Sequence, residues 1–123
     1  MERRLIRPSS AKVASLPTRI STRAVIGIRS VIENGTTIRN AFLMGADFYQ
    51  AEDPQPLPGR PPLGIGARSV IEGAIIDKNA HIGDDVVISP AGKPENMDGD
   101  NYFIRDGVVV VPKGAVIPAG TKI

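Results

Sequence analysis

Large aliphatic residues recur along this chain at a spacing of six positions, and a small or β-branched residue stands four positions after most of them. A period of six is neither the 3.6-residue period of a helix nor the two-residue period of a strand. It is typical of a parallel β-helix with a triangular cross-section, in which each hexapeptide forms one face and one corner. The aliphatic series is Ile20, Ile26, Ile32, Ile38 and Met44, then Ile65, Ile71, Ile76, Ile82 and Ile88, then Val111, Ile117 and Ile123.

The small partners and the turn residues follow the same repeat. The spacing shortens by one residue between Ile71 and Ile76 and then continues unchanged. The small partners are Ala24, Ser30, Thr36, Ser69, Ala80, Val86, Ala115 and Thr121. Gly, Asn and Asp stand between the hexapeptides, where sharp corners need them. An ordinary sandwich is disfavoured, because its strands would not keep one register across their turns. The pattern predicts an all-β fold, a left-handed parallel β-helix (a hexapeptide-repeat prism) over residues 20–123.

Two segments interrupt the repeat, at about residues 49–62 and 89–101. The first contains five prolines, and the second is polar and rich in Gly, Pro and Asp. Proline removes a donor from a strand ladder, and neither segment offers the inward aliphatic residues of the repeat. We expect both to leave the prism as corner loops.

Composition narrows the possible functions. The absence of cysteine excludes disulfides, Fe–S clusters and thiolate zinc sites. The formal net charge of +2 is too balanced to indicate a nucleic-acid partner. No apolar run approaches the ~20 residues of a membrane span, so we expect no membrane partner. Residues 1–19 are basic, and we interpret them as a linker from an upstream domain rather than as a transit peptide.

Candidate catalytic groups are few. His81 is the only histidine, so a three-histidine zinc site is excluded, although some hexapeptide acyltransferases use one histidine as a general base. Because His81 directly precedes the inward Ile82, we interpret it as a partly exposed strand residue. Gly64 and Gly66 lack the third glycine and the following helix of a dinucleotide fingerprint. We therefore predict no catalytic residue, no metal site and no cofactor in this chain.

Lys78 and Lys113 are the remaining candidates for a binding site. Both stand at corners of the predicted prism, and residues a whole number of coils apart stack along one edge. Two stacked ammonium groups could hold a phosphate or a carboxylate by charge-assisted bonds. We expect no carboxylate partner beside them. The second interpretation is that both lysines are simply solvated.

Several motifs resemble one family closely. They are VIGIRS at 25–30, LMGADFY at 43–49, AIIDKNAHIGD at 74–84, YFIRDG at 102–107 and VPKGAVIPAGT at 111–121. These segments are similar to the C-terminal left-handed β-helix domain of plant and cyanobacterial-type ADP-glucose pyrophosphorylase (glucose-1-phosphate adenylyltransferase). The M-G-A-D and I-I-D-K-N-A segments go beyond what generic hexapeptides share.

The resemblance implies a regulatory and oligomerisation domain of an enzyme that makes ADP-glucose for starch or glycogen synthesis. It further implies homo- or hetero-oligomers formed through the β-helix, and anionic effectors such as 3-phosphoglycerate and phosphate that bind Lys78 and Lys113. The nucleotidyltransferase catalytic domain of that family has no counterpart in this chain. The implied location is the plastid in a plant or alga and the cytoplasm in a bacterium.

One departure from the family concerns charge, and two other functions remain open. Glu72 and Gly73 stand where the family has Lys-Arg, which we expect to remove positive charge near the effector site. The first alternative function is a stand-alone hexapeptide-repeat acyltransferase that depends on His81. The second is a non-catalytic β-helix scaffold.

Overall fold

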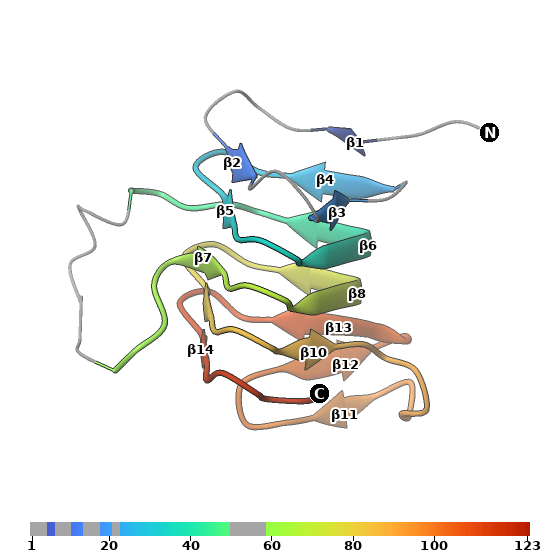
Figure 1. Ribbon diagram of the computed structural model, residues 1–123. Coiled ribbons are helices and arrows are strands. Elements are labelled where there is room, and N and C mark those ends of the chain that lie inside the picture. The colour runs from blue at the N-terminus through green and yellow to red at the C-terminus, as the bar shows by residue number, and fades with distance from the viewer. Residues whose placement is uncertain (1–4, 7–10, 14–17, 21–22, 50–58) are drawn as a thin grey trace.

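The computed structural model describes residues 5–6, 11–13, 18–20, 23–49 and 59–123, which form strands and turns (Figure 1). These residues contain no helix, and so none that could cross a membrane. The strands are β1 (Leu5–Ile6), β2 (Lys12–Val13), β3 (Arg19–Ile20), β4 (Ala24–Ile26), β5 (Val31–Ile32), β6 (Thr37–Leu43), β7 (Gly64–Ile65), β8 (Val70–Ile76), β9 (His81–Ile82), β10 (Val87–Ile88), β11 (Met97–Asp98), β12 (Phe103–Arg105), β13 (Val108–Val111) and β14 (Val116–Ile117).

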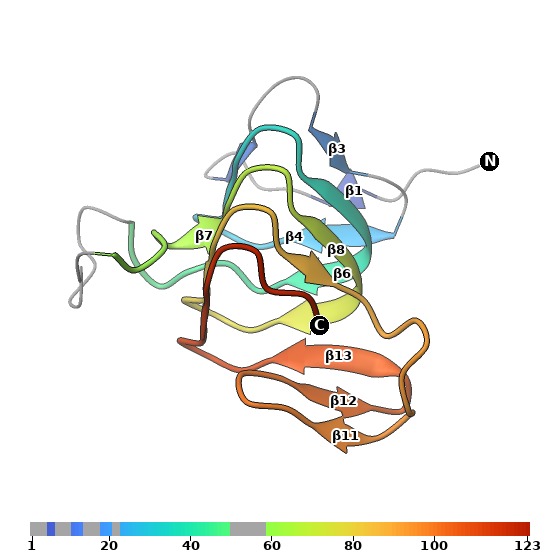
Figure 2. The same ribbon diagram turned by 60° about the horizontal axis from the view of Figure 1, so that its bottom comes forward.

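The strands form three parallel ladders, which are the faces of a prism. Face A consists of β1, β4, the second halves of β6 and β8, and β13. Face B consists of β2, β5, β7, β9 and β14. Face C consists of β3, the first halves of β6 and β8, and β10. The chain passes from A to B to C in every complete coil, and Figure 2 shows the coils wrapping around one interior. We call the edges between faces AB, BC and CA.

The predicted aliphatic series fills this interior. On each face the inward residues of successive coils lie directly opposite one another, so that the core is a set of aligned aliphatic columns. The columns are Ile26, Leu43, Ile76 and Val111 on face A, Ile32, Ile65, Ile82 and Ile117 on face B, and Ile38, Ile71 and Ile88 on face C. All of these side chains are buried.

The prediction is wrong for one member of the aliphatic series. Met44 is 37% exposed, and the inward position belongs to Leu43, which is 3% exposed. Leu43 lies opposite Ile76, because the step from Ile38 is shortened by one residue just as the step to Ile76 is. The shortened step turns edge CA through a residue of positive φ, Asn40 at 48°. The shortening predicted for one coil therefore occurs in two neighbouring coils.

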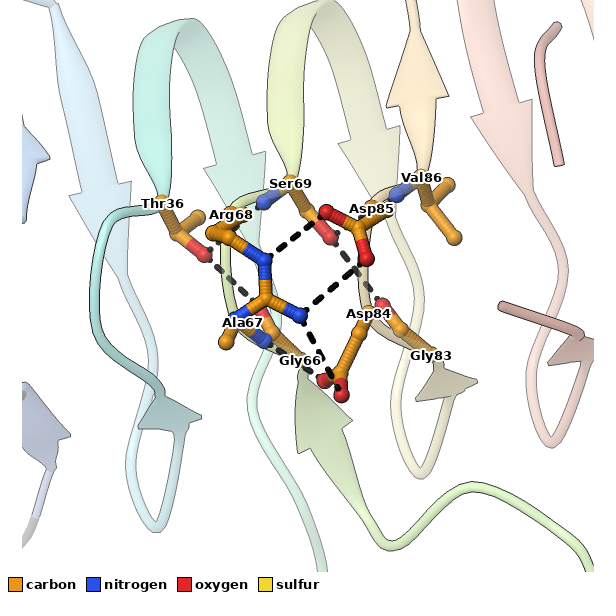
Figure 3. A network of polar contacts seen from close by, with 9 residues as sticks. All are labelled: Thr36, Gly66, Ala67, Arg68, Ser69, Gly83, Asp84, Asp85 and Val86. Carbon is orange, nitrogen blue, oxygen red and sulfur yellow. Dashed lines mark hydrogen bonds and ion pairs between the residues drawn. The ribbon is translucent and has the colours of Figure 1, made fainter. Parts of the chain in front are cut away.

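Edge BC is stabilised inside by two buried hydroxyl groups and outside by an ion pair (Figure 3). Thr36 Oγ1 donates to the carbonyl of Gly66 at 2.6 Å, and Ser69 Oγ donates to the carbonyl of Gly83 at 3.0 Å. Each hydroxyl donates to a backbone carbonyl of the next coil. Without these hydroxyl groups the two carbonyls would be buried without this hydrogen-bond partner. On the solvent side, the guanidinium of Arg68 binds both carboxylate oxygens of Asp85, at 2.9 and 3.1 Å.

The described strands begin before residue 20. β2 pairs with β5 and β3 pairs with β6, both in parallel, so this part of residues 1–19 adds to the stack. A role for residues 1–19 as a linker from another domain stays a prediction.

The two interruptions of the repeat differ in structure. Residues 49 and 59–62 form no strand, as expected of a loop, and residues 50–58 lie outside the described residues. The segment 89–101, by contrast, is not loop throughout. It contains β11, which pairs antiparallel with β12, and β12 in turn pairs antiparallel with β13. Face A therefore continues beyond its last parallel strand, as the lower part of Figure 1 shows.

Candidate anion-binding site

Edge AB brings together corner segments from four consecutive coils. Backbone hydrogen bonds join them in order. The amide of Ala46 donates to the carbonyl of Ile28 at 3.0 Å, that of Asn79 to Gly45 at 3.1 Å, and that of Gly114 to Lys78 at 2.9 Å. Residues that are far apart in the sequence thus become neighbours along one edge.

Lys78 and Lys113 both reach the carboxylate of Asp47. The distance from Lys78 Nζ to Asp47 Oδ1 is 3.2 Å, and that from Lys113 Nζ to Asp47 Oδ2 is 3.6 Å. The expectation that no carboxylate would lie beside these lysines is therefore wrong. The two ammonium groups do converge on one place, because each carboxylate oxygen holds one of them.

Asn79 fixes the position of Asp47. The backbone amide of Asp47 donates to Asn79 Oδ1 at 2.8 Å, and Asn79 Nδ2 donates back to Asp47 Oδ2 at 3.1 Å. The hydrogen bond from Asn79, followed by that from Lys78, holds the pKa of Asp47 below its usual value of 3.8. The positive charges of Lys78 and Lys113 lower the pKa further, so Asp47 is a carboxylate at neutral pH.

The backbone conformation and close packing at position 45 require a glycine. Its φ is +87°, a left-handed conformation that side chains disfavour. A Cβ at this position would also overlap the backbone carbonyl oxygen of Ile28 in the preceding coil. The M-G-A-D motif therefore combines a glycine that permits close stacking with a carboxylate two residues later that binds the lysines.

Arg29 supports the same segment from the preceding coil. Its Nε donates to the carbonyl of Ala46 at 2.9 Å, and its guanidinium lies 5.9 Å from the centre of the Tyr49 ring. Arg29 thereby holds the backbone directly before Asp47. Sequence reasoning assigned no role to Arg29 or Asp47, although both stand in motifs that carry the family resemblance.

Solvent reaches both lysines. The side chain of Lys78 is 42% exposed and that of Lys113 is 63% exposed. A dissolved anion with several oxygens can therefore approach both ammonium groups without any rearrangement of the core. It would meet Asp47 between them, so binding requires the lysines to share or exchange this partner.

Glu72 does not belong to this edge. It lies on edge CA, where its carboxylate is 2.9 Å from the guanidinium of Arg39 and accepts a hydrogen bond from Ser89 Oγ at 2.9 Å. The prediction that Glu72 lies near the lysines is therefore wrong. β8 runs from edge CA, where Glu72 lies, to edge AB, which begins just after Ile76 and holds Lys78.

His81 is buried on face B rather than partly exposed, with only 2% of its surface accessible. It alternates with the inward Ile82, so it points outward, and residues 60–61 cover it. Arg60 donates to Nε2 at 2.8 Å, and Nδ1 is 2.9 Å from the carbonyl of Pro61. Because a guanidinium only donates, Nε2 accepts and Nδ1 carries the proton. Both ring nitrogens form hydrogen bonds within the chain. This arrangement does not favour the acyltransferase alternative, which needs His81 as an accessible general base.

The described residues contain no group of three or more His, Asp or Glu side chains that could hold a metal ion. The group of Lys78, Lys113 and Asp47 at edge AB is therefore the candidate site that we consider further.

Comparison with known proteins gives two findings. The model of the GLGC left-handed parallel beta-helix domain matches residues 11–122, which confirms the predicted fold. The chain is also 45% identical, over 105 residues, to the chloroplastic/amyloplastic small subunit of glucose-1-phosphate adenylyltransferase from Triticum aestivum. That alignment covers 81% of this chain and 22% of the wheat protein, so the chain spans about a fifth of the length of this relative.

Proposed function

The chain belongs to the family of GLGC left-handed parallel β-helix domains, and from this premise we propose that it is the regulatory and assembly domain of a glucose-1-phosphate adenylyltransferase. The enzyme would make ADP-glucose for starch or glycogen synthesis. The wheat relative is named as a small subunit, which supports a role in assembly for this domain. Its chloroplastic/amyloplastic location supports the plastid as the location of this chain in a plant or alga. For a bacterial source we propose the cytoplasm.

The regulatory part of the proposal is that Lys78 and Lys113 together bind an anionic effector, such as 3-phosphoglycerate or phosphate. One observation carries it, namely that two ammonium groups from consecutive coils meet at the single carboxylate of Asp47. A phosphate group has more oxygens and more negative charge than one carboxylate. It can therefore contact both lysines while Asp47 keeps its two hydrogen bonds with Asn79.

A phosphate titration followed by NMR tests this proposal. Inorganic phosphate and 3-phosphoglycerate would be added separately to the parent chain and to Lys78→Ala and Lys113→Ala. We expect amide shifts at residues 45–47, 77–79 and 112–114 in the parent. Each substitution removes one charge-assisted bond of ~1.5–3 kcal/mol, so binding should weaken roughly ten- to a hundredfold.

Lys122→Ala is the matched control, because Lys122 is an exposed lysine on face C. It should leave both titrations unchanged. Absent shifts in the parent, or equal affinity in the parent and both edge variants, would show that edge AB holds no effector.

A further inference from the structure

Face A presents a continuous row of apolar side chains to solvent. We call this row the apolar stripe, and it consists of Val25, Phe42, Ile75, Val110 and Phe103. Each member lies directly opposite the next across the strands β4, β6, β8, β13 and β12, which lie side by side in Figure 1. The side chains of Phe42, Ile75 and Phe103 remain between 38% and 46% exposed.

Within the part of the chain that the structure describes, neither of the other two faces has such a row. On face C, the outward positions of successive coils are Arg19, Thr37, Val70, Val87 and Lys122. On face B, the outward position of β9 is His81, which residues 60–61 cover. A contiguous apolar row on an uncovered sheet face is a candidate interaction surface.

We propose that the apolar stripe is the contact surface for a second copy of this chain, packed face to face about a two-fold axis that runs parallel to the strands through Ile75. This inference names the surface behind the assembly role proposed above and rests on that role. In such an interface the same patch serves both copies.

The order of side-chain sizes supports this occupant. When the stripe of one copy is reversed against that of the other, Val25 faces the partner's Phe103 and Phe42 faces the partner's Val110. Ile75, at the axis, faces the partner's Ile75. An aromatic ring then meets a small β-branched side chain at every level away from the axis. Opposed sheets pack about 10 Å apart with interdigitating side chains, which requires this alternation of large and small. Without the reversal, each phenylalanine would meet another phenylalanine.

The charges at the two ends of the stripe are also complementary. Arg23 precedes β4 at one end, and Asp106 follows β12 at the other end. The reversed arrangement brings Arg23 of each copy to the Asp106 end of the other. Two other pairs of charges near the stripe bind within the chain, since Arg39 is 2.9 Å from Glu72 and Arg105 is 2.6 Å from Asp98. Opposite charges at the ends favour one orientation of the two copies.

The size of the stripe sets the strength of the contact. Strands about 4.8 Å apart with about 3.3 Å per residue give the stripe a footprint of roughly 200–250 Å². Stable interfaces bury about 800 Å² per partner, so the stripe supports a weak dimer that depends on concentration.

Sedimentation velocity of the 123-residue chain over a wide concentration range tests the inference. We expect a monomer–dimer equilibrium in the parent. Ile75→Lys places two like charges at the axis and should raise the dissociation constant at least tenfold. Ile28→Lys is the matched control, because Ile28 is 45% exposed but lies outside the stripe, and it should behave like the parent. Thermal unfolding checks that both variants fold.

A charge exchange provides the second arm of the test. Arg23→Asp and Asp106→Arg should each weaken the dimer a few-fold, whereas the double variant should restore it. A dimer unchanged by Ile75→Lys would overturn the surface and leave the assembly role intact. A parent that stays monomeric would overturn both, and the phosphate titration would still decide the effector role independently.

Discussion

Asp47 and Lys78, which come from consecutive coils, form an ion pair in which Oδ1 lies 3.2 Å from Nζ. In the proposed effector role, the anion therefore has to share its position with this carboxylate. Asp47→Asn removes a negative charge that repels an approaching anion, although solvent screens this repulsion. We expect phosphate affinity to rise by a few-fold at most, as measured by NMR titration.

Asp84→Asn is the control for this prediction, because Asp84 lies on edge BC beside Arg68. It should not change phosphate affinity. Weaker binding by Asp47→Asn would contradict the prediction and would mean that Asp47 acts by holding the two ammonium groups together.

A second prediction concerns the close approach at Gly45. Gly45→Ala combines an unfavourable left-handed φ with overlap onto the backbone of Ile28. Gly114→Ala, on the same edge, has a similar φ of +74° but nothing within 4 Å of the added carbon. We expect Gly114→Ala to lower the free energy of unfolding by ~1–2 kcal/mol. Gly45→Ala should lower it by a further ~1–3 kcal/mol. Urea unfolding measures both, and equal losses would refute the overlap.

A third prediction concerns the buried hydroxyl of Ser69, which bonds the carbonyl of Gly83 and the amide of Val86. Ser69→Ala leaves both backbone groups buried without this partner. The expected loss of unfolding free energy is ~1–3 kcal/mol. Thr121→Val, on the same edge but with its hydroxyl near solvent, should change stability by less than ~0.5 kcal/mol. If the two variants lose equal stability in urea, the buried hydroxyl has no special role.

A fourth prediction concerns acid stability. The hydrogen bond from Arg68 and then its charge lower the pKa of Asp85, and Asn79 and Lys78 lower that of Asp47. A lowered folded-state pKa stabilises the fold above the unfolded value of about 3.9, and this stabilisation is lost as the pH falls through the folded value. Thermal stability should therefore decline below about pH 4.

The double variant Asp47→Asn, Asp85→Asn should show a shallower decline over the same pH range. Asp100→Asn, an exposed aspartate outside these ion pairs, serves as its control and should follow the parent. An identical pH dependence in the parent and the double variant would exclude these two carboxylates as the cause.

The hexapeptide spacing predicted the prism because β-branched columns and corner residues repeat in every coil. It failed at Met44 because Leu43 and Met44 are both apolar, so only the position of the corner decides between them. The sequence signal was the shortened step to Ile76, which the coil containing Leu43 has to match in order to stay in register. The strands before residue 20 were missed because Val13 and Ile20 are seven residues apart, which is one more than the repeat. β11 and β12 escaped prediction because an antiparallel ladder does not follow the hexapeptide repeat.

The lysines of the candidate site were predictable from their corner positions, but their common partner was not. The segment that follows Tyr49 interrupts the repeat just after Asp47. The spacing of six therefore cannot show which residues of the next coil lie beside Asp47. His81 was misjudged for a related reason, since the residues that bury it belong to the same interruption and not to a neighbouring strand.

The stacking of corners on edge AB gives this protein a fixed scale of distances. Successive coils lie about 4.8 Å apart, whatever length of chain intervenes between them. Lys78 and Lys113 are one coil apart, whereas Arg29 and Lys78 are two coils apart. In the proposed effector role, the cations that contact two anionic groups of one ligand start from backbone positions separated by multiples of this step. We therefore expect that moving one arginine or lysine by a single coil along this edge changes the ligand length that the proposed site prefers, without altering the fold.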